Sequence, residues 1–120
     1  MASKRGLSGQ FKGIITGASS GIGKAMALDL AKKYQARLVL NARSEAQLDE
    51  TCKAVEEAGG KAVKVVGDVS DKAVIEAMVN SCMESFGGID LLVNNAGLAK
   101  PGKIMNITVE DWERVFAVNF

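Results

Sequence analysis

A glycine-rich run near the start of the chain constrains the fold more than any other feature. The run is Thr16-Gly17-Ala18-Ser19-Ser20-Gly21-Ile22-Gly23, with apolar Gly13-Ile14-Ile15 before it and a helical pattern from Lys24. Glycine lacks a Cβ, so a ligand can approach the backbone closely and a positive φ costs little. A helix that begins there directs unpaired N–H groups and the positive end of its dipole at a bound anion. This arrangement predicts a site for the pyrophosphate of a nucleotide.

Strand-like and helix-like segments alternate along the rest of the chain. We predict strands over 11–16, 37–42, 62–66 and 89–94, and helices over 21–34, 44–58, 70–86 and from Thr108. The strands are nearly continuous apolar runs, as in a parallel sheet covered on both faces. Right-handed crossovers then give an α/β, Rossmann-like, doubly wound sheet, here partial, with strand order 3-2-1-4 and helices on both faces.

Local signals place the helix boundaries. In the first helix, Met26, Leu30 and Tyr34 form an apolar stripe. Ser44 and Gln47 make a capping box at the start of the second helix. The glycine pairs 59–60 and 87–88 are expected to end the second and third helices.

Composition excludes several classes of partner. The 120 residues suffice for one domain, and 15 basic against 14 acidic residues leave a net charge of +1. Charge of this size predicts neither nucleic-acid nor membrane binding, and no apolar run is long enough to span a bilayer. The polar, basic residues 1–10 do not resemble a signal peptide, so we expect a cytoplasmic protein.

The absence of histidine narrows the chemistry. With no histidine in the chain, His-dependent triads and histidine metal ligands are excluded, and we predict no metal site. Cys52 and Cys82 fall within helical patterns, which indicates reduced, partly buried thiols. Acid–base chemistry would have to use Tyr, Lys, Asp, Glu or Cys.

Three motifs in order resemble those of one family. The run from Thr16 to Gly23 resembles the cofactor-binding motif of the classical short-chain dehydrogenases/reductases, although its spacing is not G-x-G-x-x-G. Gly67-Asp68-Val69 is similar to the adenine-contact segment of that family, and Asn94-Asn95-Ala96-Gly97 to its Asn-Asn-Ala-Gly motif. The resemblance runs from about Phe11 to Phe120, and ketoacyl-carrier-protein-reductase-like and general alcohol-dehydrogenase-like members look most similar. The alternative is a glycine-rich turn that binds nothing.

The resemblance implies roles at the pyrophosphate. Gly17, Gly21 and Gly23 would shape the turn, and the N–H of Ile22 would face a phosphate.

At the adenosine, the resemblance makes Asp68 the acceptor of a hydrogen bond from the adenine amine, helped by the backbone of Val69. The alternative for Asp68 is a helix-capping carboxylate before Ser70. The ribose side would be lined by Asn95, Ala96 and Gly97, while Asn94 would brace the sheet.

The end of the second predicted strand bears on the choice of cofactor. NAD sites place an acidic residue there for the ribose 2′-hydroxyl, and NADP sites use arginine for the 2′-phosphate. This chain has Asn41-Ala42-Arg43, and the planar fork of a guanidinium suits a phosphate. Ser19 or Ser20 could add a hydroxyl contact. We therefore expect NADP(H) rather than NAD(H), the alternative being that Arg43 is only a solvated loop charge.

One catalytic residue is implied near the end of the sequence. The segment from Trp112 to Asn119 matches a Trp…Val-Asn segment of the family, in which the asparagine belongs to the catalytic tetrad and helps hold a water. The alternative is an asparagine at a frayed helix end.

Other catalytic elements of the family do not occur in these residues. The family uses a Tyr-x-x-x-Lys pair and a serine, but Tyr34 is the single tyrosine and Leu38 stands four residues later. We expect residues 1–120 to form the N-terminal, dinucleotide-binding part of one Rossmann domain, without turnover of their own. The whole protein would be an NADP(H)-dependent oxidoreductase that transfers hydride between nicotinamide and a carbonyl or hydroxyl compound.

A second hypothesis is a non-catalytic half-domain that binds a nucleotide or associates with itself. The fourth predicted strand would expose an apolar edge at Leu91, Leu92 and Val93, and open edges pair with other strands. A homo-oligomer is expected under either hypothesis.

Overall fold

The computed structural model describes residues 11–95, in which four strands alternate with three helices. The elements in chain order are β1 (Lys12–Ile15), α1 (Gly21–Tyr34), β2 (Arg37–Ala42), α2 (Glu45–Glu57), β3 (Lys61–Val66), α3 (Lys72–Phe86) and β4 (Leu91–Val93). The predicted residues Ala96, Gly97 and Asn119, and the predicted helix from Thr108, lie outside this range.

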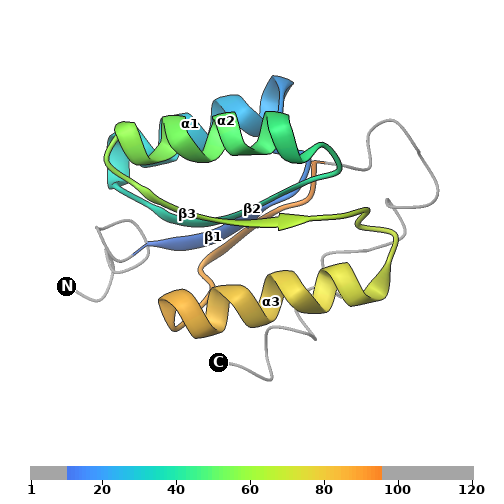
Figure 1. Ribbon diagram of the computed structural model, residues 1–120. Coiled ribbons are helices and arrows are strands. Elements are labelled where there is room, and N and C mark those ends of the chain that lie inside the picture. The colour runs from blue at the N-terminus through green and yellow to red at the C-terminus, as the bar shows by residue number, and fades with distance from the viewer. Residues whose placement is uncertain (1–10, 96–120) are drawn as a thin grey trace.

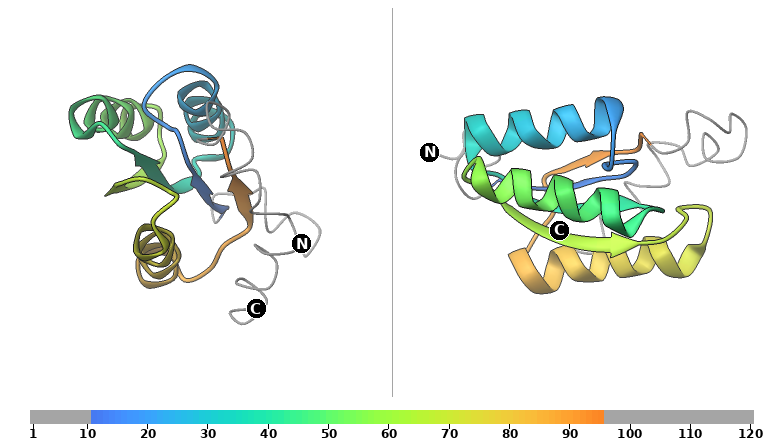
Figure 2. Two further views of the ribbon diagram at one scale, coloured as in Figure 1. Left: turned by 90° about the vertical axis from the view of Figure 1, so that its right-hand side faces the viewer. Right: turned by 45° about the horizontal axis from the view of Figure 1, so that its top comes forward.

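All strand pairs are parallel, and the sheet has the order β3-β2-β1-β4. In the centre of the sheet, Ile14 of β1 is level with Val39 of β2 and with Leu92 of β4. Figure 1 shows α1 and α2 on one face of this sheet and α3 on the other, and the end-on view of Figure 2 separates the three layers. The α/β fold, the strand order and the two covered faces are confirmed.

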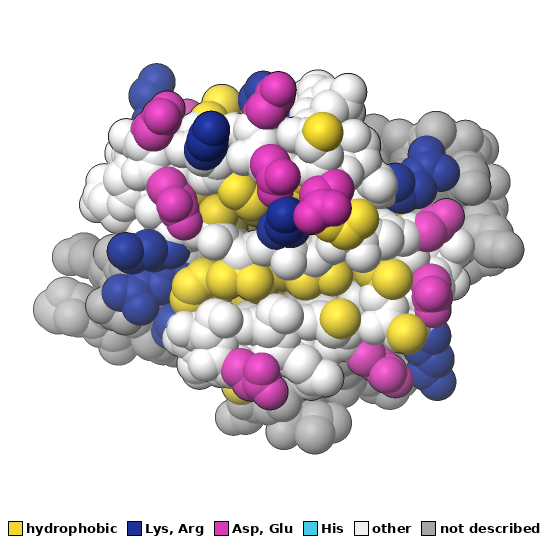
Figure 3. Space-filling model, in the orientation of Figure 1, with side chains coloured by type: hydrophobic (Ala, Val, Ile, Leu, Met, Phe, Trp, Pro, Cys, Tyr) yellow, Lys and Arg dark blue, Asp and Glu magenta, His cyan; other side chains and the backbone are white. Residues whose placement is uncertain are grey.

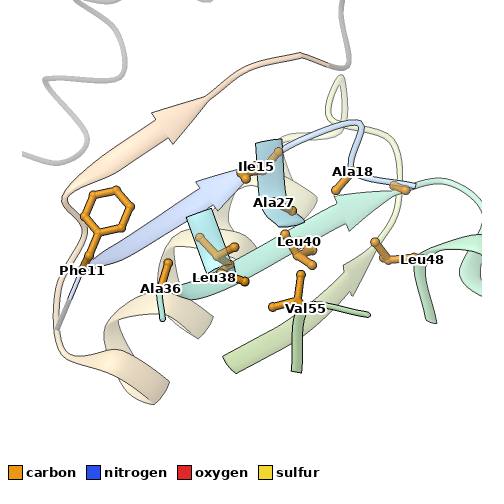
Figure 4. Packing of buried hydrophobic residues seen from close by; sticks show 11 residues of the cluster. Phe11, Ile15, Ala18, Ala27, Ala36, Leu38, Leu40, Leu48 and Val55 are labelled. Atoms are coloured by element: carbon orange, nitrogen blue, oxygen red, sulfur yellow. The ribbon is translucent and has the colours of Figure 1, made fainter. Parts of the chain in front are cut away.

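The core is divided between the two faces because side chains alternate along each strand. Leu38 and Leu40 of β2 are fully buried toward α1 and α2, where Ala27 and Val55 lie beside them (Figure 4). Val39, between them, belongs to the second cluster, which packs under α3. Both faces of the central strand are thus covered, as expected of a parallel sheet.

The buried face of α1 differs from the predicted stripe. Met26, Leu30 and Tyr34 are only half-buried, whereas Gly23, Ala27 and Ala31 are buried. Small side chains let the helix axis come close to the sheet, and larger residues then fit along its margins.

Helix ends follow the predicted signals with small shifts. The Ser44 hydroxyl accepts a hydrogen bond from the Gln47 N–H at 3.4 Å and caps α2, and Gly87, with φ 82°, ends α3. However, α3 begins at Lys72 rather than at residue 70, because the carboxylate of Asp71 caps it by accepting from the Ala73 N–H at 2.9 Å. The strands predicted at 11–16 and 89–94 are one or two residues shorter at each end.

The surface of one face combines charge with an apolar band. Figure 3 shows most acidic and basic side chains of this view above a band of hydrophobic groups that crosses the face. Half-buried apolar residues of β3 and α3 include Val63, Val65, Ile75, Met83 and Phe86. No helix among residues 11–95 is both long and apolar enough to cross a membrane.

A pair of truncations tests this core. Leu40→Ala removes a fully buried side chain from the central strand β2 and should lower the free energy of unfolding by about 2–5 kcal/mol. Val66→Ala, on β3, changes a side chain that is 40% exposed and should cost less than about 1 kcal/mol. Urea unfolding followed by circular dichroism measures both, and equal losses would contradict the assigned core.

Candidate functional site

The turn between β1 and α1 needs glycine for two different reasons, backbone conformation and lack of space. Gly17 and Gly21 have φ values of 62° and 58°, which side chains disfavour. Gly23 needs glycine for a different reason, since a Cβ there would overlap the carbonyl oxygen of Gly17 and lie 2.9 Å from the Asn95 amide nitrogen. The first turn of α1 therefore lies directly against the end of β1.

The N-terminus of α1 is open to an anion. Ser20 is the N-cap but its side chain makes no capping hydrogen bond, and the first turn contains no acidic residue. The first N–H groups of a helix have no partners within it, and the helix dipole adds positive potential. Ser20 is exposed, and Ile22 is 62% exposed, so this turn faces solvent.

The end of β4 is fastened to the end of β1 by one buried hydroxyl. Thr16 Oγ1 accepts from the Asn95 N–H at 2.8 Å, and lies 3.3 Å from the Val93 carbonyl and 3.1 Å from Asn94 Oδ1. Asn95 also donates from its side chain to the Gly17 carbonyl at 3.2 Å. The Asn94 side chain thus contacts the sheet, where it was expected to act as a brace, and Asn95 holds the glycine turn itself.

The segment after β3 forms a turn of its own. Asp68 Oδ1 accepts from the Ser70 N–H at 2.8 Å, while Val69 is buried. The alternative reading of Asp68 as the helix cap is wrong, because Asp71 occupies the N-cap position of α3.

Arg43 follows β2 on an exposed stretch and takes part in none of the ion pairs between residues 11 and 95. The acidic residues of α2 nearest in sequence are held elsewhere, since Lys64 of β3 contacts Glu45 and Asp49 at 2.7 Å each. Hydrogen bonds to Asp49 and Glu45 raise the pKa of Lys64 above its ordinary value. The guanidinium of Arg43 is therefore available to a ligand.

Parallel strands place all these segments on one edge of the sheet. Since β1, β2, β3 and β4 run in one direction, their carboxyl ends meet at the side that Figure 2 (left) turns toward the viewer. The predicted site residues within the structure all lie at these strand ends: Gly17, Ser19, Ser20, Gly21, Ile22, Gly23, Arg43, Asp68, Val69 and Asn95.

The remaining candidates for chemistry lie away from this edge or are inert. Tyr34 ends α1 and its ring packs against Phe11, with centroids 6.1 Å apart. Burial raises the pKa of the Cys82 thiol to about 12, and burial also raises the pKa of Cys52. Within the described residues, no three metal-ligating side chains gather at one place.

Two residues of this edge were not assigned roles from the sequence. Thr16 and Asn41 are buried polar residues at the ends of β1 and β2, and their side chains bond to the ends of neighbouring strands. A polar residue that ends an otherwise apolar strand is the only signal the sequence offers, since such groups must be hydrogen-bonded when buried.

Comparison with known proteins agrees with this geometry. An open parallel sheet whose carboxyl edge meets a glycine turn and a helix N-terminus defines a Rossmann-type dinucleotide-binding fold. The family model for short chain dehydrogenases matches residues 13–120, and the chain belongs to this family. It is therefore related to oxidoreductases.

Two of the similar curated proteins are bacterial dehydrogenases. A 3beta-hydroxysteroid dehydrogenase of Eggerthella lenta is 40% identical over 107 residues, which cover 88% of this chain and 41% of that protein. Glucose 1-dehydrogenase 2 of Bacillus subtilis is 40% identical over 111 residues, with 88% and 42% covered. The chain thus spans about two fifths of the length of these relatives.

Solved structures share the fold. L-sorbose reductase from Gluconobacter frateurii, in complex with NADPH and L-sorbose, has a TM-score of 0.68 and 38% identity over 90% of this chain and 43% of that one. A short chain dehydrogenase/reductase from Burkholderia phymatum, in complex with NAD, has a TM-score of 0.64 and 36% identity over 68% and 28%. Relatives with either nucleotide bound are therefore similar to this chain.

The contact between Gly23 and Gly17 can be tested by adding one methyl group. Gly23→Ala places a Cβ against the Gly17 carbonyl oxygen and should lower the free energy of unfolding by about 1–3 kcal/mol. Gly88→Ala is the control, because its Cβ would meet only the Lys12 side chain at 3.6 Å, an ordinary contact. If chemical denaturation finds the two variants equally stable, the glycine turn has space for a Cβ at position 23, and the assigned contact with Gly17 is contradicted.

Proposed function

We propose that this chain provides the adenosine and pyrophosphate half of an NADP(H)-dependent short-chain oxidoreductase, whose reaction transfers hydride between nicotinamide and a carbonyl or hydroxyl compound. The observation that carries the proposal is the β1–α1 turn, in which the Gly17 carbonyl excludes any Cβ at position 23 and the helix N-terminus is left uncapped by a side chain. Family membership supports the oxidoreductase class.

The pyrophosphate would bind at the N-terminus of α1. Gly17, Gly21 and Gly23 let it approach the backbone, and the N–H of Ile22 donates to a phosphate oxygen. The Ser19 and Ser20 hydroxyls lie in the same turn and add donors. Because the first turn of α1 has no acidic residue, no carboxylate of that turn opposes the phosphate charge.

The adenosine would bind between the ends of β3 and β4. Asp68 accepts a hydrogen bond from the adenine amine, and the backbone of Val69 lies beside the base. Asn95, followed by Ala96 and Gly97, lines the ribose. Support comes from the fixed geometry of two of these residues, since Asp68 is bonded to the Ser70 N–H and Asn95 to Thr16 and Gly17.

Arg43 would select NADP(H) over NAD(H). The end of β2 carries no carboxylate that would repel a 2′-phosphate, and the Arg43 guanidinium is not engaged with any acidic group among residues 11–95. The nearby carboxylates of Glu45 and Asp49 both pair with Lys64, whose single positive charge offsets part of their negative charge. Since similar proteins are known with NADPH and with NAD, the proposed preference for NADP(H) rests on Arg43 and its surroundings at the end of β2.

Catalysis would need more than these residues. Asn119 is the one member of the family's catalytic set that the sequence suggests, and it would help hold a water in the proton relay. We propose that residues 1–120 are part of a single domain and show no turnover alone, because no Tyr-x-x-x-Lys pair occurs among them. The whole protein is proposed to be a cytoplasmic homo-oligomer acting on a small carbonyl or alcohol substrate.

A second candidate is a non-catalytic nucleotide-binding or self-associating half-domain. It is favoured by β4, which ends the described sheet and whose Leu91, Leu92 and Val93 are only half-buried. This candidate predicts that the 120-residue chain forms dimers or larger species, measured by light scattering across a concentration series. A monomer at every concentration would exclude self-association.

The choice of cofactor has a direct test in Arg43→Met. Because hydrogen bonds to charged groups are worth about 1.5–3 kcal/mol, the variant should lose about tenfold or more in affinity for NADPH and little for NADH. Arg37→Met is the matched control, since Arg37 begins the same strand at the opposite edge of the sheet. Calorimetric titration of each variant with both nucleotides, at one ionic strength, gives the affinities.

Two outcomes would contradict the proposal. Equal losses for NADPH and NADH in Arg43→Met would mean that Arg43 does not distinguish the 2′-phosphate. Tighter binding of NADH than of NADPH by the unaltered chain would reverse the assigned preference.

A further inference from the structure

Asn41 is a buried amide in a strand that is otherwise apolar toward its end. It is the penultimate residue of β2, is 1% exposed, and alternates with Leu40 and Ala42, whose side chains pack toward α1 and α2. The Asn41 side chain therefore lies on the α3 side of the sheet. A buried carboxamide is costly unless its polar atoms are paired, so its partners show what it does.

The partners of Asn41 belong to both of its neighbouring segments. Its side-chain nitrogen donates to the carbonyl oxygens of Val65 at 2.9 Å and Gly67 at 3.1 Å. Both partners are acceptors, so the amide nitrogen and not the amide oxygen must face them. On its other side, the Asn41 backbone carbonyl accepts from the Ala18 N–H of the glycine turn at 2.8 Å.

Gly67 is held at both of its peptide groups. Its N–H donates to the Ala42 carbonyl at 3.0 Å, and its carbonyl accepts from Asn41. Its φ of 150° and the 2.6 Å that would separate an added Cβ from the Val74 side chain both require glycine. Because glycine has no side chain to restrain this peptide group, the hydrogen bond from Asn41 sets the direction of the Gly67 carbonyl.

That carbonyl direction also fixes the start of Asp68. The Gly67 carbonyl and the Asp68 N–H belong to one planar peptide unit, so they turn together. At its other side, the Asp68 carboxylate is fixed by the Ser70 N–H at 2.8 Å. Asp68 is thus restrained by Asn41 before it and by Ser70 after it, and its carbonyl also accepts from the Asp71 N–H at 2.9 Å.

We propose that Asn41 is a positioning residue for adenine recognition. Its carboxamide holds the Gly67–Asp68 peptide in the orientation that points the Asp68 carboxylate at the exocyclic amine of the base. The inference rests on the proposed function, in which Asp68 accepts from that amine. Asn41 itself does not touch the nucleotide, and it acts through the backbone of the segment after β3.

If Asn41 had only a structural role, its substitution would not change which base the chain prefers, so base selectivity is the property to measure. We compare NADPH with its reduced hypoxanthine counterpart, in which the amine donor is replaced by a carbonyl oxygen that a carboxylate repels. The unaltered chain should bind the adenine form about tenfold more tightly or better, as expected for a hydrogen bond to a charged group. Asp68→Asn should bring this ratio close to one.

Asn41→Leu removes both donors at nearly unchanged volume and should lower the adenine preference about three- to tenfold. Asn41→Thr keeps one hydroxyl donor, and its adenine preference should lie between those of the unaltered chain and Asp68→Asn. If Asn41→Leu does not fold, Asn41→Thr decides alone. The matched control is Thr51→Val in α2, which deletes another fully buried donor, bonded to the Gln47 carbonyl at 3.5 Å, and should leave the ratio unchanged.

The outcomes separate the two claims. A chain that binds neither dinucleotide refutes the proposed function, and a ratio near one in the unaltered chain refutes Asp68 as the acceptor; either result overturns the inference as well. An adenine preference that Asp68→Asn abolishes, but that the folded Asn41 variants keep in full, refutes the role of Asn41 alone. A reduced preference in the Asn41 variants with an unchanged ratio in Thr51→Val supports it.

Discussion

The close approach of α1 to the end of β1 is the constraint on which the geometry of the sheet's carboxyl edge depends. A Cβ at Gly23 would overlap the carbonyl oxygen of Gly17, so the first turn of the helix contacts the glycine turn after β1 through backbone atoms. The same carbonyl accepts a hydrogen bond from Asn95, which brings the end of β4 to this contact. These contacts fix the helix N-terminus, the glycine turn and two strand ends relative to one another.

Buried polar side chains connect the other strand ends to this contact. Thr16 joins β1 to the segment after β4, and Asn41 joins β2 to the segment after β3. The Asn41 backbone carbonyl also accepts from Ala18 in the glycine turn. A continuous set of hydrogen bonds therefore runs along the carboxyl edge of the sheet, from Asn95 to Gly67.

The parts of the structure set by local pattern could be predicted from the sequence. Continuous apolar strands predicted the parallel sheet, and its strand order is the usual one of a doubly wound, Rossmann-type sheet. The Ser44 cap and the Gly87 helix end were found where the sequence indicated. Of the predicted apolar stripe of α1, Met26 and Leu30 pack against the core but are only half-buried, because Ala27 and Ala31 make the closest approach to the sheet. The start of α3 was placed two residues too early, because Ser70 belongs to the turn held by Asp68 and the helix begins only after its cap, Asp71.

The connecting residues could not be predicted because their partners are distant in sequence. Thr16 bonds to groups 77 to 79 residues away, and Asn41 to groups 24 and 26 residues away, so their roles appear only once the strands are side by side. The ligand contacts of Arg43, Asp68 and Asn95 are of another kind. Their positions agree with the predicted edge, but contact with a nucleotide stays a prediction.

The most direct test of the central claim is to map NADPH onto the chain by the chemical shifts of its backbone amides in NMR spectra. A ligand at the carboxyl edge should shift the amides of Ala18, Ile22, Asp68 and Asn95. It should leave those of Gln35 and Gly59 unchanged, since these residues follow α1 and α2 at the opposite edge. Shifts confined to the opposite edge, or no shifts at a saturating concentration of NADPH, would contradict the assignment of this edge as the dinucleotide site.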